Sequence, residues 1–223
     1  MSERDQQRMI EVGGREVAIN HSDKVLFPDD AITKFELADY YRKVAEVELA
    51  ANGDVAALLC EGGERIELLR GVVVRMSPQS SRHAYAVRRL DRLFQLALQG
   101  QVEVCAQLPF AALGDTQPEP DLTLVPPGDY LDDHPPEAYL VVEVANSSLE
   151  RDRVIKRAIY AENGVPEYWV VNLIAGTVEV HTDPSDGDYA TKQTFPRGSS
   201  IVLHAFPGVS VPVDDFVPPA AAE

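Results

Sequence analysis

The apolar run YLVVEVA, residues 139–145, constrains the fold more than any other stretch of the sequence. Leucine and valine dominate it, as is typical of a strand that is covered on both faces in the centre of a sheet. One acidic residue, Glu143, lies inside the run. An ionised carboxylate that leaves water without a partner is strongly unfavourable, so we expect a compensating group beside it.

Strand patterns and helix patterns alternate after residue 64. The predicted strands are RIELL, VVVRM, VEVCAQLPF, DLTLV, YLVVEVA, EYWVVNL, TVEVHT and SIVL. Two helices are predicted between them. The first is capped by Ser80 or Ser81 and ends at Gly100. The second is capped by Ser147 or Ser148 and ends at Gly164. Helices that lie between strands favour a mixed α/β fold, with a central mixed sheet flanked by helices.

The chain is predicted to have three parts. Residues 1–55 form an N-terminal extension with one short strand, REVAI, and an amphipathic helix whose capping box begins at Thr33. Residues 60–215 form the main α/β domain, and residues 216–223 form a disordered tail.

Composition limits the function. The net charge is −16, with 36 Asp and Glu against 20 Lys and Arg, so any DNA binding must rest on a local site. Two cysteines, Cys60 and Cys105, are too few for a disulfide framework. No apolar run approaches the roughly 20 residues of a membrane span. The first residues, MSERDQQRM, are charged, so we expect a cytoplasmic protein without a signal peptide or a membrane anchor.

Asp121 and Glu143 form a candidate metal site. Asp121 opens one apolar strand and Glu143 lies inside another, and carboxylates on neighbouring strands can converge on one hard cation. A cation would supply the positive charge that Glu143 lacks, and it could activate water for attack on a phosphate. Lys156 lies on the following helix and could reach the site, because Asp152, Lys156 and Tyr160 share one helix face.

These motifs resemble the PD-(D/E)XK nucleases, with Pro120-Asp121 and Glu143-Val144-Ala145 as the matching residues. Ala145 stands where that superfamily usually has lysine, and Lys156 would replace it. The stretches ERIELLRGVVVRMSPQSSRH, PEPDLTLV, YLVVEVANSS and DRVIKRAIYAENGVPEYWVVNL are more specifically similar to the Uma-two family of restriction-endonuclease-like proteins. The family's E-L-x-x-G motif adds a third acid, Glu67.

The resemblance implies an endonuclease that hydrolyses DNA phosphodiester bonds with Mg²⁺ or Mn²⁺. Asp121 and Glu143 would hold the metal, with the Val144 carbonyl as a further ligand and Glu67 as an outer acid. Lys156 would orient or activate the attacking water. Such nucleases often act as dimers, so a homodimer is expected.

Residues 11–46 resemble a different family, the ligase D type of end-joining DNA ligases, at the start of its polymerase domain. The segments DKVLFP and ITKFELADYYR carry the likeness. It ends before the catalytic acids of that domain, so no polymerase activity is expected. The segment is interpreted as a fusion remnant, or as an element that docks a DNA-repair protein through residues 1–50.

Simpler roles compete with the catalytic ones. Glu143 could form a buried ion pair with Lys156 or Arg153, with or without a metal. Lys156 could be an exposed lysine paired with Asp152. Glu67 could be a solvent-exposed acid at a sheet edge.

The same holds for the candidate nucleic-acid contacts. His83 could bind phosphate or act as a base, or it could simply cap or pack its helix. Arg82, Arg88, Arg89 and Arg92 form the one basic cluster, which could contact phosphates or solvate a helix face. The alternative function is a catalytically inactive nuclease-like fold that serves as a binding or accessory module, for example in DNA end repair. The net charge favours this alternative, and the intact acidic pair of Asp121 and Glu143 disfavours it.

Overall fold

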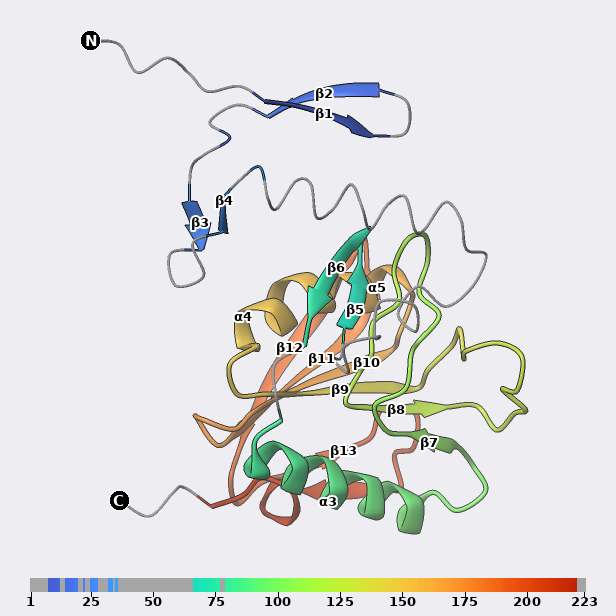
Figure 1. The fold of residues 1–223 in the computed structure, drawn as a ribbon. Coiled ribbons are helices and arrows are strands. Elements are labelled where there is room, and N and C mark those ends of the chain that lie inside the picture. The colour runs from blue at the N-terminus through green and yellow to red at the C-terminus, as the bar shows by residue number, and fades with distance from the viewer. Residues whose placement is uncertain are drawn as a thin grey trace. The chain divides into compact units, whose positions relative to one another are not determined.

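The computed structural model describes residues 8–12, 15–19, 22, 25–27, 32–33, 35, 66–76 and 79–219 (Figure 1). The chain divides into two compact units, one of Met1–Ile66 with Val72–Arg75 and one of Glu67–Gly71 with Met76–Glu223. The second of these is the core unit. In the described ranges, no helix has the length and apolar character needed to cross a membrane.

The described part of the first unit consists of short strands. β1 (Arg8–Val12) pairs antiparallel with β2 (Arg15–Ile19), which confirms the predicted strand REVAI. β3 (Val25–Phe27) pairs with β4 (Ile32–Thr33). Most of the predicted N-terminal helix, residues 36–50, lies outside the described residues.

The core unit is built on a six-stranded mixed sheet with the order β12-β11-β10-β9-β8-β7. Only β9 and β10 run parallel, and every other neighbouring pair is antiparallel. The strands are β7 (Glu103–Cys105), β8 (Leu122–Val125), β9 (Leu140–Ala145), β10 (Glu167–Asn172), β11 (Thr177–Ser185) and β12 (Asp188–Pro196). The predicted mixed sheet is confirmed.

Helices cover both faces of this sheet (Figure 1). α3 (Ser81–Ala97) packs its Leu90 and Phe94 against the face that carries Val142 and Val144. Parallel strands need a long crossover, and α4 (Leu149–Arg151), η2 (Asp152–Lys156) and α5 (Arg157–Glu162) supply it on the other face. Residues alternate between the two faces along a strand, so Glu143 points to the face opposite α3.

A hairpin precedes the sheet, as the sequence predicts. β5 (Ile66–Leu69) and β6 (Val72–Arg75) form a two-stranded sheet. The turn between them uses Arg70 at φ +52° and Gly71 at φ +73°. Glycine has no Cβ and adopts this left-handed conformation without strain.

The structure differs from the sequence-based prediction at three places. The strand predicted over VEVCAQLPF is confined to β7, because Gln107 has φ +56° and interrupts the extended chain. β12 was not predicted, since most of its side chains are polar and exposed and leave no apolar pattern. The tail was predicted to begin at residue 216, but Phe216 and Val217 are fully buried.

The chain ends on small elements that close the core. β13 (Ser200–Val202) pairs with β14 (Ser210–Pro212), and the short helix η3 (Val213–Asp215) follows. Ile201, Val211 and Val213 join the hydrophobic core beneath the sheet. The packed chain therefore continues beyond the predicted domain boundary at residue 215.

Candidate functional site

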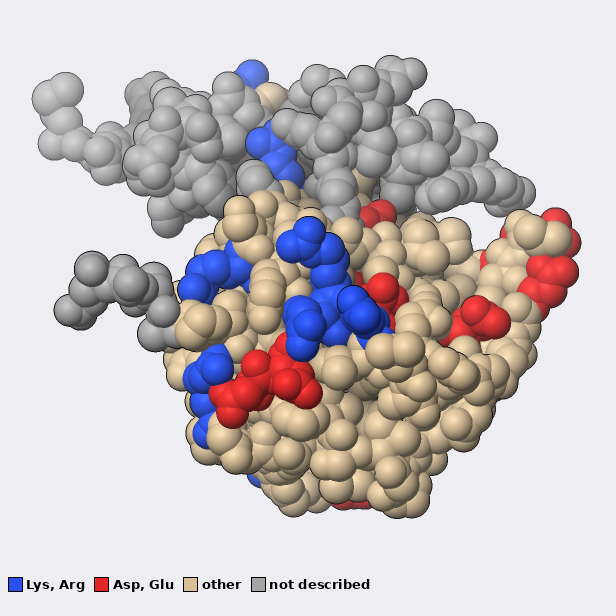
Figure 2. All heavy atoms as spheres, turned by 90° about the horizontal axis from the view of Figure 1, so that it is seen from below, with Lys and Arg blue, Asp and Glu red and all other residues tan. Residues whose placement is uncertain are grey.

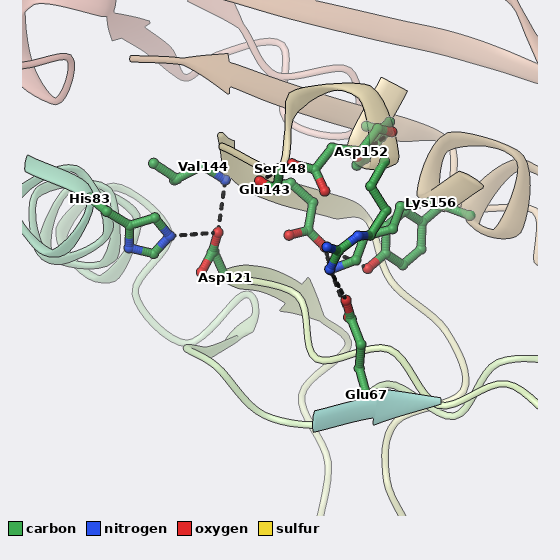
Figure 3. A network of polar contacts seen from close by, with 11 residues as sticks. Glu67, His83, Asp121, Glu143, Val144, Ser148, Asp152 and Lys156 are labelled. Carbon is green, nitrogen blue, oxygen red and sulfur yellow. Dashed lines mark hydrogen bonds and ion pairs between the residues drawn. The ribbon is translucent and has the colours of Figure 1, made fainter. Parts of the chain in front are cut away.

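Four acidic side chains are buried close to one another in the core unit (Figure 3). Glu67 on β5, Asp121 just before β8, Glu143 on β9 and Asp152 on η2 are at most 5% exposed. The one buried lysine among them is Lys156, which is 3% exposed. These five residues, called the acid cluster, all belong to the core unit.

Lys156 lies between two of the acids. Its Nζ is 2.7 Å from Glu67 Oε2 and donates a hydrogen bond of 3.0 Å to Glu143 Oε1. Two of the simpler roles are therefore wrong: Lys156 is not an exposed lysine, and Glu67 is not a solvent-exposed acid. Arg153, the other candidate partner of Glu143, instead forms an ion pair with Glu179.

Glu143 is only partly compensated by this pairing. Burial raises the pKa of Glu143 well above its ordinary value, and the Lys156 ammonium opposes this shift without cancelling it. Burial alone lowers the pKa of Lys156, but the Glu143 and Glu67 carboxylates outweigh it and raise that pKa above its ordinary value. Two carboxylates therefore hold Lys156 in its charged form, whereas Glu143 has only Lys156 as a cationic partner and shares it with Glu67.

Tyr160 and Asp152 complete the surroundings of Glu143. The Tyr160 hydroxyl donates a hydrogen bond of 2.8 Å to Glu143 Oε1, and burial beside Glu143 raises the pKa of that hydroxyl. Burial also raises the pKa of Asp152, which accepts a hydrogen bond from the Ser148 hydroxyl at 2.6 Å. Neither residue was singled out as catalytic, although their helical spacing from Lys156 in the sequence signalled the shared face.

The helix that carries these groups is locally a π-helix. In η2 the backbone N–H of Arg157 bonds to the carbonyl of Asp152, five residues back. Within this turn Asp152 and Lys156 are buried, whereas Val154 and Ile155 are exposed. π-Turns inside α-helices are frequent at functional sites.

Asp121 is fixed by two contacts. Its Oδ2 accepts a hydrogen bond of 2.8 Å from the Val144 amide and lies 3.0 Å from His83 Nε2. The His83 amide in turn donates to the Ser80 hydroxyl, which caps the N-terminus of α3. The predicted cap at Ser80 or Ser81 is therefore Ser80. His83 is buried at the start of α3 and touches the acid cluster.

The donor set fits a hard cation with few protein ligands. Every contact of Asp121 uses Oδ2 and every contact of Glu143 uses Oε1, so the second oxygen of each carboxylate has no hydrogen bond to a described residue. Within the described ranges, no three His, Cys, Asp or Glu side chains form a metal cluster. One or two carboxylates completed by water are typical of Mg²⁺.

Two of the three predicted nucleic-acid contacts on α3, Arg82 and Arg88, form no hydrogen bond to the described residues of the acid cluster. Arg82 bonds to the carbonyl oxygens of Pro218 and Pro219 at 3.3 and 2.5 Å. Arg88 is exposed. Of the three candidates, only His83 contacts a residue of the acid cluster.

Comparison with known proteins decides the family. A family model described as "Uma2: Putative restriction endonuclease" matches residues 55–214. The chain belongs to the Uma2 family. The Uma2 match contains every residue of the acid cluster, and restriction-endonuclease-like families generally use divalent metals. The sequence-based resemblance to this family is thereby confirmed, whereas the resemblance of residues 11–46 to ligase D enzymes stays a prediction.

A solved structure supports the same fold. A crystal structure described as a "putative nuclease belonging to DUF820" from Anabaena variabilis is similar with a TM-score of 0.59 and 13% sequence identity. The similarity covers 69% of this chain and 89% of that chain. At this identity it shows the fold alone, and the Uma2 core is restriction-endonuclease-like. No curated protein matches the chain.

Proposed function

We propose that the chain is a divalent-metal-dependent endonuclease that hydrolyses DNA phosphodiester bonds at the acid cluster. The observation that carries the proposal is the surplus of buried negative charge, with four buried acids around one buried lysine. A chain keeps such a surplus only where a cation or a function compensates it. Membership of a family described as "Putative restriction endonuclease" supports the same reaction.

Each member of the cluster has a proposed role. Asp121 and Glu143 would hold the cation through their second oxygens, and the Val144 carbonyl would be a further ligand. When bound, a divalent cation lowers the pKa of a water molecule and stabilises the charge that develops on the phosphate. Lys156 would orient the attacking water, and Glu67 would keep the ammonium in position from its other side.

The test is cleavage of supercoiled plasmid and of single-stranded DNA with Mg²⁺ or Mn²⁺. The variants Asp121→Asn and Glu143→Gln keep the shape of the side chains but remove the charge that would bind the cation. We expect each to reduce cleavage by at least about 100-fold, which corresponds to about 2.7 kcal/mol of transition-state stabilisation. Glu150→Gln, at an 84% exposed side chain in the same region of the chain, is the matched control and should cleave like the wild type.

Equal residual cleavage by the wild type and both variants would indicate a contaminating nuclease and contradict the proposal. The competing proposal is a catalytically inactive binding module, which the net charge of −16 and the pairing of Lys156 with two acids favour. Thermal unfolding separates the two. A metal site gains stability with Mg²⁺ concentration as RT ln(1 + [L]/Kd), and Asp121→Asn should lose this gain.

A further inference from the structure

The positive charges of the core unit are distributed in an unusual way. Outside α3, each of its described Lys and Arg side chains forms an ion pair with a carboxylate; they are Arg70, Arg151, Arg153, Lys156, Arg157, Lys192 and Arg197. Such pairs largely cancel the field of the cation. They contribute little to the attraction of an anionic partner.

The four arginines of α3 differ from all of these. Within the described part of the chain, no carboxylate forms an ion pair with Arg82, Arg88, Arg89 or Arg92. Arg82 bonds to the carbonyls of Pro218 and Pro219, and Arg89 Nε bonds to the carbonyl of Asp215 at 2.7 Å. A carbonyl carries no net charge, so these bonds do not cancel the positive charge of Arg82 or Arg89. None of the four arginines is therefore neutralised by a described carboxylate.

These arginines gather on one side of the molecule. Figure 2 views it from the side on which α3 lies in Figure 1, and basic side chains cluster there beside a smaller acidic group. Arg88 and Arg92 are exposed and four residues apart, so they lie on one face of the helix. The four arginines are called the α3 basic face.

The α3 basic face leads to the acid cluster. α3 begins at Ser81, and His83 in its first turn lies 3.0 Å from Asp121. A helix rises about 1.5 Å per residue, so Arg88 and Arg92 lie about 7.5 and 13.5 Å along the axis from His83, on the exposed side of the helix, whereas His83 is on its buried side. A polyanion bound along the exposed side would therefore reach the N-terminal end of α3, where His83 contacts Asp121.

We propose that the α3 basic face binds the sugar-phosphate backbone of a nucleic acid strand and guides it toward the acid cluster. The binding itself does not require cleavage, but its purpose, delivery of the strand to the acid cluster, rests on the proposed nuclease function. Within the face, Arg88 and Arg92 contact phosphates, while Arg82 and Arg89 hold the C-terminal segment and add long-range attraction. This local site explains how a chain of net charge −16 can bind DNA.

The test measures binding without cleavage. Fluorescence anisotropy of labelled duplex and single-stranded DNA is recorded in EDTA and with Ca²⁺, for the full chain and for Arg88→Gln/Arg92→Gln. The matched control is Arg70→Gln/Arg157→Gln. These two arginines are paired with Glu162 and Asp188, and both double variants change the net charge from −16 to −18 by removing two positive charges.

We expect the α3 variant to raise Kd about tenfold or more at low salt, and the control to change it less than about twofold. Loss of two phosphate contacts should also reduce the slope of log K against log salt for duplex DNA by about 1.8. Equal losses in both variants would mean that only total charge matters, and unchanged binding in both would exclude the α3 basic face. Either result overturns the inference.

The outcomes separate this inference from the nuclease proposal. If the wild type binds through α3 but never cleaves, the inference stands and the nuclease proposal fails. If it cleaves while the α3 variant binds like the wild type, the inference alone fails. A wild-type dimer that the α3 variant dissociates, with DNA binding unchanged, would assign this surface to a second acidic copy of the chain and overturn the inference.

Discussion

At the scale of single residues, the buried carboxylate of Glu143 is the group whose effect on stability is clearest. Its Oε1 accepts hydrogen bonds from Lys156 and Tyr160, so the carboxylate is hydrogen-bonded rather than isolated. Yet Lys156 is shared with Glu67, and burial still raises the pKa of Glu143. A group kept in this condition lowers the stability of the folded chain at neutral pH, which is common for residues that serve a reaction.

Glu143→Gln should therefore stabilise the protein at neutral pH. The pKa of Glu143 is higher in the folded state than in the unfolded state, so the wild type loses stability as pH rises from the unfolded value through the folded one. Glutamine does not titrate and retains an oxygen that can accept both hydrogen bonds. We expect the free energy of unfolding of the variant to exceed that of the wild type at pH 7.5, and the difference to shrink toward pH 4.

Urea unfolding at both pH values measures this difference. Glu150→Gln, at the exposed position, is the control and should change stability by less than about 0.5 kcal/mol at either pH. A lower stability of Glu143→Gln at pH 7.5 would mean that the ion pair with Lys156 is worth more than the burial of the charge costs. That result would contradict the view that the Glu143 carboxylate is only partly compensated.

At the scale of elements, the N-cap of α3 can be tested at Ser80, with the neighbouring Ser81 as the control. The Ser80 hydroxyl accepts a hydrogen bond of 3.2 Å from the His83 amide, whereas Ser81 lies inside the helix and is exposed. Ser80→Ala should lower the free energy of unfolding by about 1 kcal/mol, and Ser81→Ala should have an effect below about 0.5 kcal/mol. Thermal unfolding of the two variants side by side measures this, and equal effects would exclude Ser80 as the cap.

The elements that the sequence predicted correctly are those with a strong local pattern. β9 and β10 are mostly apolar and were recognised as buried strands, and the helix ends were near serine caps and glycines. β12 was missed because it is a polar edge strand whose place is set by pairing with β11. Pairing across a sheet leaves little trace in the sequence of an exposed strand.

The sequence predicted which residues come together and one of their contacts, the buried ion pair of Glu143 with Lys156, but not the others. Asp121, Glu143, Glu67 and Lys156 do come together, since strand register and helix periodicity fix where side chains point. The π-turn at η2 was not predictable, because nothing in DRVIK departs from an ordinary helix pattern. The contact between His83 and Asp121 was likewise missed, since it joins two elements through tertiary packing.

At the scale of the whole molecule, the two units differ in what they contain. The six-stranded sheet, the hydrophobic core cluster and the acid cluster all lie in the core unit. The family match begins at residue 55, close to the same division. The core unit thus holds every described residue that the proposed reaction requires.

Two truncated chains test this division. A chain that begins at residue 64 keeps Glu67 and the whole sheet, so we expect it to unfold cooperatively and to keep the Mg²⁺-dependent stabilisation and the cleavage activity of the full chain. A chain that begins at residue 76 keeps the sheet but lacks Glu67. Lys156 then loses its contact with Glu67 and keeps only the one with Glu143, so its position is less fixed and cleavage should fall. Urea unfolding and plasmid cleavage measure both effects, and equal behaviour of the two chains would exclude a role for Glu67 in holding Lys156.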